Sequence, residues 1–215
     1  IALLNGVILE HTAHFLSFSP AYSTFQVSSF AKEKPVAKFF GHEKLACIAS
    51  DGVLAVAGTA NGYLFVWQVS SGALLKVLNK VHFQQVSALT FNNDYLCSAS
   101  VDGTVKVWDK HTLVTGENAE PRYSYAAHGL EVVMVRFGLV GDRLCRLFTC
   151  SLDSTVLVYD MFDGGMSAKF TFPSPCKCVT VDAMETLMAV GCENGAVYLL
   201  DLDSTSNEIV MNMNK

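Results

Sequence analysis

Apolar and polar residues form short alternating blocks along this chain, a pattern typical of β-strands joined by turns. Pairs of apolar runs, each four to seven residues long, recur with turn-forming residues between them. Clusters such as Asn92-Asn93-Asp94 favour tight turns. The paired runs cover 45–49 with 53–57, 86–91 with 95–99, 132–137 with 144–150, and 178–181 with 187–191. No segment shows a convincing helical period, so the pattern predicts an all-β fold.

A repeated motif follows each pair of runs. Four nine-residue segments, beginning at Ala60, Val101, Leu152 and Glu193, align without a gap. Each reads Asp or Asn, then Gly or Ser, then a strand that ends in a large apolar residue. These apolar residues are Trp67, Trp108, Tyr159 and Leu200, and they are 41, 51 and 41 residues apart. A period of about 40–45 residues with a terminal Trp-Asp is typical of a four-stranded propeller blade.

The repeated residues have predictable structural roles. Asn61, Asp102, Asp153 and Asn194 occupy the expected tight turns, where a short polar side chain can bond to the backbone. The large apolar residue fills the gap between neighbouring strands. His42, His82 and His128 stand at the same place near the start of three successive repeats.

These features resemble the WD-repeat family. In that family an opening His, a strand Ser or Thr, a turn Asp and a strand Trp form a buried hydrogen-bonded set within one blade. The whole set occurs once, as His82, Ser98 or Ser100, Asp102 and Trp108. The other repeats keep part of it, as His42, Asn61 and Trp67, as His128, Asp153 and Tyr159, and as Asn194 alone. The resemblance implies an incomplete arc of four to five four-stranded antiparallel β-propeller blades.

The repeat positions give expected blade boundaries. We expect a degenerate partial blade over 1–40, blades over 41–80, 81–127, 128–173 and 174–203, and a tail or the start of another blade over 204–215. Within the first segment, 6–12, 23–30 and 35–40 predict strands of a blade that lacks its first strand. The polar insert 113–121 is expected to be a solvated loop, and it is the first candidate for contact with a partner. Because the chain begins at Ile1, we expect it to be a fragment of a longer protein.

Composition narrows the class of function. Hydrophobic residues make up 51% of the chain and charged residues 16%, so a substantial core is expected. No apolar run approaches the roughly 20 residues of a membrane-spanning helix, so no membrane contact is expected. The net charge is −5 and no Lys/Arg cluster occurs, which argues against direct, sequence-specific nucleic-acid binding.

Cysteine usage and the recurring His–Asp pairs suggest neither a metal site nor catalysis. The seven cysteines are odd in number and lie mostly in apolar runs, as expected for buried thiols in a reducing compartment. Cys176 and Cys178 lack the second ligand pair of a structural zinc site. The His–Asp pairs recur with the repeats, whereas a catalytic set would be unique, and no nucleophile elbow or phosphate loop is present. We therefore expect no catalytic residues, no cofactor and no metal, and interpret the chain as a protein-interaction scaffold.

Three further stretches carry a narrower resemblance. They cover 2–6, 151–156 and 178–182, the last followed by 191–195 and 201–202. They resemble the nuclear WD-repeat subunits of the Rix/Ipi-type complexes, which contain PELP and TEX proteins in animals. This resemblance implies a nucleolar and nucleoplasmic scaffold in pre-rRNA processing and maturation of the large ribosomal subunit. It also implies a HEAT- or armadillo-like partner subunit, a pre-ribosomal particle that carries the midasin ATPase, and further blades outside this segment.

Two alternatives stay open from the sequence. One is a generic WD-repeat adaptor in another assembly, such as a ubiquitin-ligase receptor, a vesicle coat or a replication complex assembled on chromatin; such a protein could be cytoplasmic. The other is a propeller enzyme. Identification of bound partners would separate the adaptors, and a turnover assay would test for an enzyme.

Overall fold

A computed structural model of the chain describes residues 5–8, 14–18, 24–29, 37–40, 43–116, 119–138, 145–203 and 209–213. The chain divides into two compact units. The N-terminal unit comprises residues 1–98 and 107–122, and the C-terminal unit comprises residues 99–106 and 123–215.

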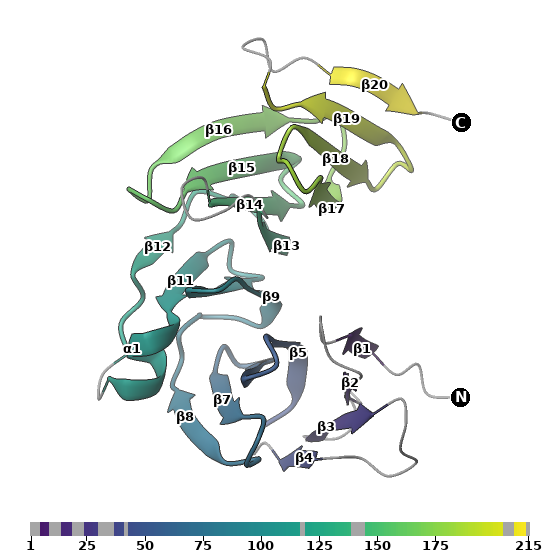
Figure 1. The fold of residues 1–215 in the computed structure, drawn as a ribbon. Helices are drawn as coiled ribbons and strands as arrows, with labels where there is room; N and C mark the ends of the chain where they lie inside the picture. The colour runs from purple at the N-terminus through teal and green to yellow at the C-terminus, as the bar shows by residue number, and fades with distance from the viewer. Residues whose placement is uncertain are drawn as a thin grey trace. The chain divides into compact units, whose positions relative to one another are not determined.

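The described residues form five four-stranded sheets, and within each sheet the strands follow one another in chain order (Figure 1). The first two sheets contain β1 (Asn5–Ile8), β2 (His14–Phe18), β3 (Thr24–Ser29) and β4 (Ala37–Phe40), then β5 (Leu45–Ser50), β6 (Leu54–Thr59), β7 (Leu64–Gln68) and β8 (Leu74–Leu78). The third contains β9 (Val86–Phe91), β10 (Tyr95–Ser100), β11 (Val105–Asp109) and β12 (Tyr123–Tyr125). The last two contain β13 (Val132–Phe137), β14 (Arg146–Ser151), β15 (Thr155–Asp160) and β16 (Met166–Thr171), then β17 (Cys176–Val181), β18 (Leu187–Cys192), β19 (Val197–Asp201) and β20 (Ile209–Met213). This arrangement confirms the predicted propeller-type blades.

The four large apolar residues of the repeat occupy equivalent positions. Trp67, Trp108, Tyr159 and Leu200 are each the second-to-last residue of the third strand in their sheets. The pairing with the fourth strand shifts register at Trp67, at Tyr159 and at Leu200. Such a bulge bends the strand locally. The gapless alignment of the sequence repeats therefore predicted the strand register correctly.

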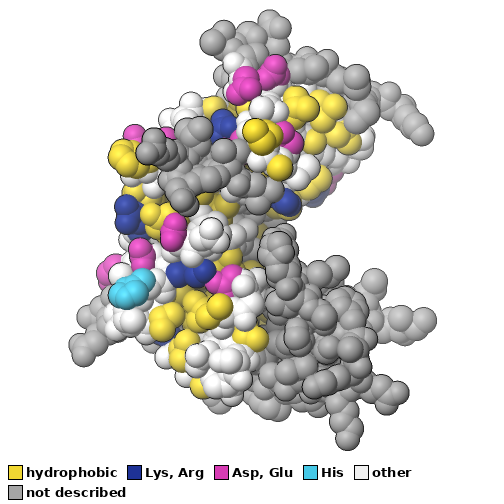
Figure 2. Space-filling model, viewed as in Figure 1, with side chains coloured by type: hydrophobic (Ala, Val, Ile, Leu, Met, Phe, Trp, Pro, Cys, Tyr) yellow, Lys and Arg dark blue, Asp and Glu magenta, His cyan; other side chains and the backbone are white. Residues whose placement is uncertain are grey.

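The two middle strands of a blade are the most deeply buried. Every residue of β6 is buried, and so are five of the six residues of β15, because the middle strands are covered on both faces. The fourth strands β8 and β16 are largely exposed. Figure 2 shows that Lys and Arg side chains are scattered over the face in view and form no continuous stripe among the described residues.

The first and last blades differ from the expected boundaries. The sequence predicted three strands before residue 41, but the structure has four, so the expectation of a missing first strand is wrong. The unpredicted strand is β2, in which His14 and Ser17 interrupt the apolar pattern. At the other end, β20 pairs with β19 and supplies the fourth strand of the last blade. The third strand of that blade ends at Asp201, so its fourth strand must come from the residues that follow. The segment expected to be a tail therefore belongs in part to the last blade.

The insert after β11 begins with a helix. Helix α1 spans Lys110–Thr115, and its N-cap Asp109 accepts a 3.0 Å hydrogen bond from the Thr112 amide. Leu113 on this helix is fully buried, so the expectation of a wholly solvated loop is wrong here. A helix of fewer than two turns is too short to show a period in the sequence. Among the described residues, no helix combines the length and the apolar character needed to cross a membrane.

Candidate functional site

The third blade holds a buried chain of three hydrogen-bonded side chains. His82 Nε2 lies 2.8 Å from Ser98 Oγ, and Trp108 Nε1 donates to the same oxygen over 3.1 Å. Ser98 is fully buried, and His82 and Trp108 are almost so. Strand β10 carries the serine and β11 carries the tryptophan, so one hydroxyl connects two strands to the loop that holds the histidine. Of the two candidates, Ser98 is therefore the residue that joins His82 to Trp108.

Ser100 and Asp102 organise the turn after β10. The Asp102 amide donates to Ser100 Oγ over 3.1 Å, and Asp102 Oδ1 accepts from the Thr104 amide at 2.9 Å and from Thr104 Oγ1 at 2.5 Å. This is the turn role that the sequence predicted for the aspartate. A direct bond between His82 and Asp102 stays a prediction.

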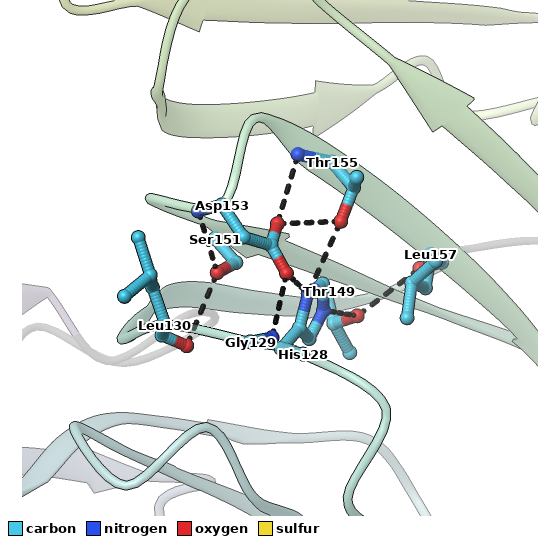
Figure 3. Close-up of polar contacts among 8 residues, drawn as sticks. All are labelled: His128, Gly129, Leu130, Thr149, Ser151, Asp153, Thr155 and Leu157. Carbon is cyan, nitrogen blue, oxygen red and sulfur yellow. Dashed lines mark hydrogen bonds and ion pairs between the residues drawn. The ribbon is translucent and has the colours of Figure 1, made fainter.

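The fourth blade shows how the histidine and the turn aspartate meet (Figure 3). His128 Nδ1 lies 3.0 Å from Asp153 Oδ2, and His128 Nε2 lies 2.8 Å from Thr149 Oγ1. The Gly129 amide also donates to Asp153 Oδ2, over 2.9 Å. Asp153 Oδ1 accepts from the amide and the hydroxyl of Thr155 at 2.9 and 2.6 Å. The network thus joins the loop before β13 to β14 and to the turn that precedes β15.

The charge states within this network follow from burial. Burial lowers the pKa of His128, and this effect outweighs the opposing influence of Asp153. For Asp153, burial acts to raise the pKa, but hydrogen bonds from Thr155, Gly129 and His128 outweigh it and lower the pKa. At neutral pH the site therefore contains an aspartate anion and a neutral imidazole. The Nδ1 proton then faces Asp153, and Nε2 accepts from Thr149.

Acidification from pH 7 to pH 5 is expected to lower the free energy of unfolding through His128. Its pKa lies below the ordinary value of 6.5 in the folded state, so the unfolded chain takes up the proton more readily as the pH falls through that value. Urea unfolding at several pH values would measure the slope. The variant His128→Gln should flatten this slope, whereas His111→Gln, at an exposed position on α1, should leave it unchanged. Equal slopes for wild type and His128→Gln would contradict the prediction.

The remaining predicted residues lie in less complete sets. Asn194 Oδ1 accepts from the Ala196 amide at 3.0 Å, the same turn bond that Asp102 and Asp153 make. Asn61 instead donates its amide to Glu43 Oε2 over 3.1 Å. Trp67 is buried and stacks on Phe65, with ring centroids 5.7 Å apart. His42 lies outside the described residues.

Tyr159 occupies the tryptophan position of the fourth blade without the tryptophan's hydrogen bond. Its ring stacks on Tyr125 with centroids 3.9 Å apart, and its hydroxyl is buried without a hydrogen-bond partner. Burial raises its pKa to about 12. The ring therefore preserves the packing of this position, while Thr149 bonds to His128 over 2.8 Å.

Thr149 and Thr155 were not anticipated from the sequence. Thr149 stands ten residues before Tyr159, as Ser98 stands ten residues before Trp108. The corresponding residues of the second and fifth blades are Ala57 and Val190, which carry no hydroxyl group. Alignment of the second strands would therefore have identified Thr149, and it would have shown why, among the second to fifth blades, the third and fourth hold the hydroxyl link.

The turn after the second strand requires an unusual backbone conformation in every repeat. Gly62, Gly103 and Gly195 have φ values between +81° and +85°, and Ser154 takes the equivalent place with φ +68°. A Cβ atom on Gly62 would also lie only 2.1 Å from the His82 carbonyl oxygen. The conformation thus favours glycine at this turn, although Ser154 adopts it in the fourth blade. At position 62, close packing against the loop that carries the histidine also requires glycine.

These networks have the properties of structural sites. His82, His128, Ser98 and Thr149 are buried, so no substrate could reach them without opening the blade. Among the described residues, no group of three or more His, Cys, Asp or Glu side chains could hold a metal ion. Four cysteines are buried and Cys178 is exposed. Burial raises the pKa of the Cys97 thiol well above its ordinary value, and it raises the pKa of the partly buried Cys47 to about 12. Buried thiols of this kind are poor nucleophiles.

Comparison with known proteins agrees with this architecture. The family model "WD domain, G-beta repeat" matches residues 72–109, which end on Trp108 and Asp109. The crystal structure of the WD40 β-propeller domain of Doa1 superposes with a TM-score of 0.72 and 18% sequence identity, covering 91% of this chain and 62% of that one. The chain belongs to the WD-repeat family.

Individual relatives show which kind of WD-repeat protein the chain is similar to. The pre-rRNA-processing protein crb3/ipi3 of Schizosaccharomyces pombe is 30% identical over 198 residues, which are 86% of this chain and 44% of the relative. The pre-rRNA-processing protein IPI3 of Yarrowia lipolytica is 33% identical, with coverages of 76% and 39%. WD repeat-containing protein 18 of Homo sapiens is 31% identical, with coverages of 94% and 46%. The chain thus spans less than half the length of these curated relatives, and its homologues include pre-rRNA-processing proteins.

Proposed function

We propose that this chain is the propeller segment of a nuclear scaffold protein that acts in pre-rRNA processing and in maturation of the large ribosomal subunit. The observation that carries the proposal is its similarity, over most of its length, to proteins named for pre-rRNA processing. The fold supports a scaffold, because a β-propeller presents the loops of successive blades as binding surfaces.

A non-catalytic role is consistent with the residues described above. The His–Asp pair of the fourth blade connects loop, strand and turn, and its polar atoms bond to one another. Replacing one residue of this pair would therefore destabilise the blade rather than remove an exposed reactive group. The protein therefore acts by binding other molecules, and enzymatic turnover forms no part of the proposal.

The proposed partners follow from the resemblance of the sequence to subunits of Rix/Ipi-type complexes. They are a HEAT- or armadillo-like scaffold subunit and a pre-ribosomal particle that carries the midasin ATPase. The scattered basic residues support recruitment to that particle through protein contacts rather than through a nucleic-acid-binding surface. Location in the nucleolus and nucleoplasm is part of the same proposal.

Depletion of the full-length protein from its own cells tests the function. We expect precursors of the large-subunit rRNA to accumulate while the small-subunit precursors stay at normal levels, as measured by blotting of total RNA. The tagged protein should co-purify large-subunit precursor particles, with the tag alone as the control. Normal rRNA processing after depletion, with co-purification of a ubiquitin ligase, a vesicle coat or a replication complex, would overturn the proposal in favour of another adaptor.

A further inference from the structure

Most of the exposed large apolar side chains of the C-terminal unit lie at one end of its last two blades. Five such side chains are exposed among its described residues, and four of them, Phe162, Met166, Met184 and Leu187, lie in or beside the turns β15–β16 and β17–β18. Phe162 is 89% exposed and Met184 is 71% exposed. Soluble proteins rarely concentrate apolar surface in this way unless it is a binding site.

The topology places these turns at the same end of the two sheets. Arg146 begins β14 and pairs in register with Asp160, which ends β15. The Arg146 guanidinium donates through Nε to Glu185 Oε2 over 2.6 Å and through Nη2 to the Glu185 carbonyl over 2.7 Å. Glu185 lies in the turn between β17 and β18. The ion pair therefore joins the end of the fourth blade at which β14 begins and β15 ends to the turn between β17 and β18, so both apolar turns lie at this end of their blades.

The same end is strongly acidic. The described residues of its turns and of the strand ends beside them include six carboxylates and one cation, Arg146, which already pairs with Glu185. The other five carboxylates belong to Asp160, Asp163, Asp182, Asp201 and Asp203. Figure 2 shows acidic and hydrophobic side chains next to one another on the surface formed by the C-terminal strands.

Hydrogen bonds within the turns fix several of these carboxylates. Asp160 Oδ1 accepts from the Phe162 amide and Asp163 Oδ1 from the Gly165 amide, both over 2.7 Å. Asp182 Oδ1 accepts from the Thr186 and Leu187 amides over 2.7 and 2.8 Å. The bond from the Leu187 amide is the main cause that lowers the pKa of Asp182. The acidic surface therefore keeps its charge and its shape near neutral pH.

We propose that this end of the C-terminal unit binds a protein segment rich in lysine and arginine that also carries large apolar side chains. The apolar turn tips would contact the apolar side chains of the segment, and the surrounding carboxylates would attract its cations. Nucleic acid does not fit this surface, because its phosphates would meet like charge. The proposal adds a class of partner to the scaffold function proposed above. It rests on that function only because a scaffold needs such a partner.

Fluorescence anisotropy with the purified chain tests the proposal. The probe is a short labelled peptide of lysine, arginine and leucine, compared with the same peptide carrying glutamate at every basic position and with a single-stranded RNA of equal length. We expect the basic peptide to bind at least roughly tenfold more tightly than the other two, with an affinity that falls as salt is added. Equal binding of the acidic peptide, or tighter binding of the RNA, would overturn the proposal.

Matched variants locate the binding. The double variant Phe162→Ser with Met184→Ser should weaken peptide binding by roughly tenfold or more. The control double variant Val53→Ser with Phe83→Ser removes equally exposed apolar side chains from the N-terminal unit and should leave binding unchanged. Equal losses in both variants would overturn the assignment to this end. The measurement uses purified protein, so its failure would leave the co-purification of pre-ribosomal particles intact and would be distinguishable from failure of the proposed function.

Discussion

Replacing Glu185 with alanine is expected to lower the free energy of unfolding by about 3 kcal/mol. The glutamate is 2% exposed, and the variant would leave the Arg146 guanidinium partly buried without its carboxylate. The site is also tightly packed, since a Cβ atom on Gly138 would lie only 1.7 Å from Glu185 Oε1. Because a quarter of the Arg146 side chain reaches solvent, the expected loss lies at the lower end of the range for broken buried pairs.

Glu193 provides a matched control for this prediction. It pairs with Lys177 over 3.0 Å, but both side chains are about half exposed. Glu193→Ala should therefore lower the free energy of unfolding by less than about 1 kcal/mol. Urea unfolding followed by circular dichroism would compare the two variants. Similar losses would show that burial adds nothing to the Arg146–Glu185 pair.

Ser98→Ala is expected to lower the free energy of unfolding by about 2–4 kcal/mol, because one deleted hydroxyl leaves two buried groups without their partner. His82 Nε2 and the Trp108 indole N–H both bond to this oxygen inside the third blade. The exposed Ser71, which bonds only to Gln68 Oε1 and to the Ala73 amide, is the control. Ser71→Ala should change stability by less than about 0.5 kcal/mol.

A double-mutant cycle distinguishes the network from simple loss of packing. Trp108→Phe removes the indole donor, so Ser98→Ala should cost less in that background than in the wild type. Thermal or urea unfolding of the four proteins would give the coupling free energy. Strict additivity would mean that the indole and the hydroxyl stabilise the blade independently.

The repeat made much of the fold predictable. The position of Trp67 in β7 could be inferred from that of Trp108 in β11, because a blade repeats both its strand order and its register. The turn roles of Asp102 and Asp153 were predictable for the same reason. Each aspartate side chain accepts from the backbone amide two residues later in the chain, and so local an interaction can be predicted from the sequence.

Features that depend on length or on distant contacts were harder to predict. Helix α1 is only six residues long, which is too short to establish a period. Arg146 and Glu185 are 39 residues apart in the chain, and they meet only because two neighbouring sheets place their turns together. Thr149 was missed because Tyr159 replaces the tryptophan that would have drawn attention to its blade.

The distribution of the large aromatic residues has an experimental consequence. The chain contains two tryptophans, Trp67 and Trp108, and both belong to the N-terminal unit. Both are buried, whereas the tryptophan position of the fourth blade holds Tyr159. Intrinsic indole emission thus reports selectively on one unit, while the stacked Tyr125 and Tyr159 rings contribute a near-ultraviolet dichroism signal from the other. The two optical signals together would show whether the units lose their structure in one step or separately.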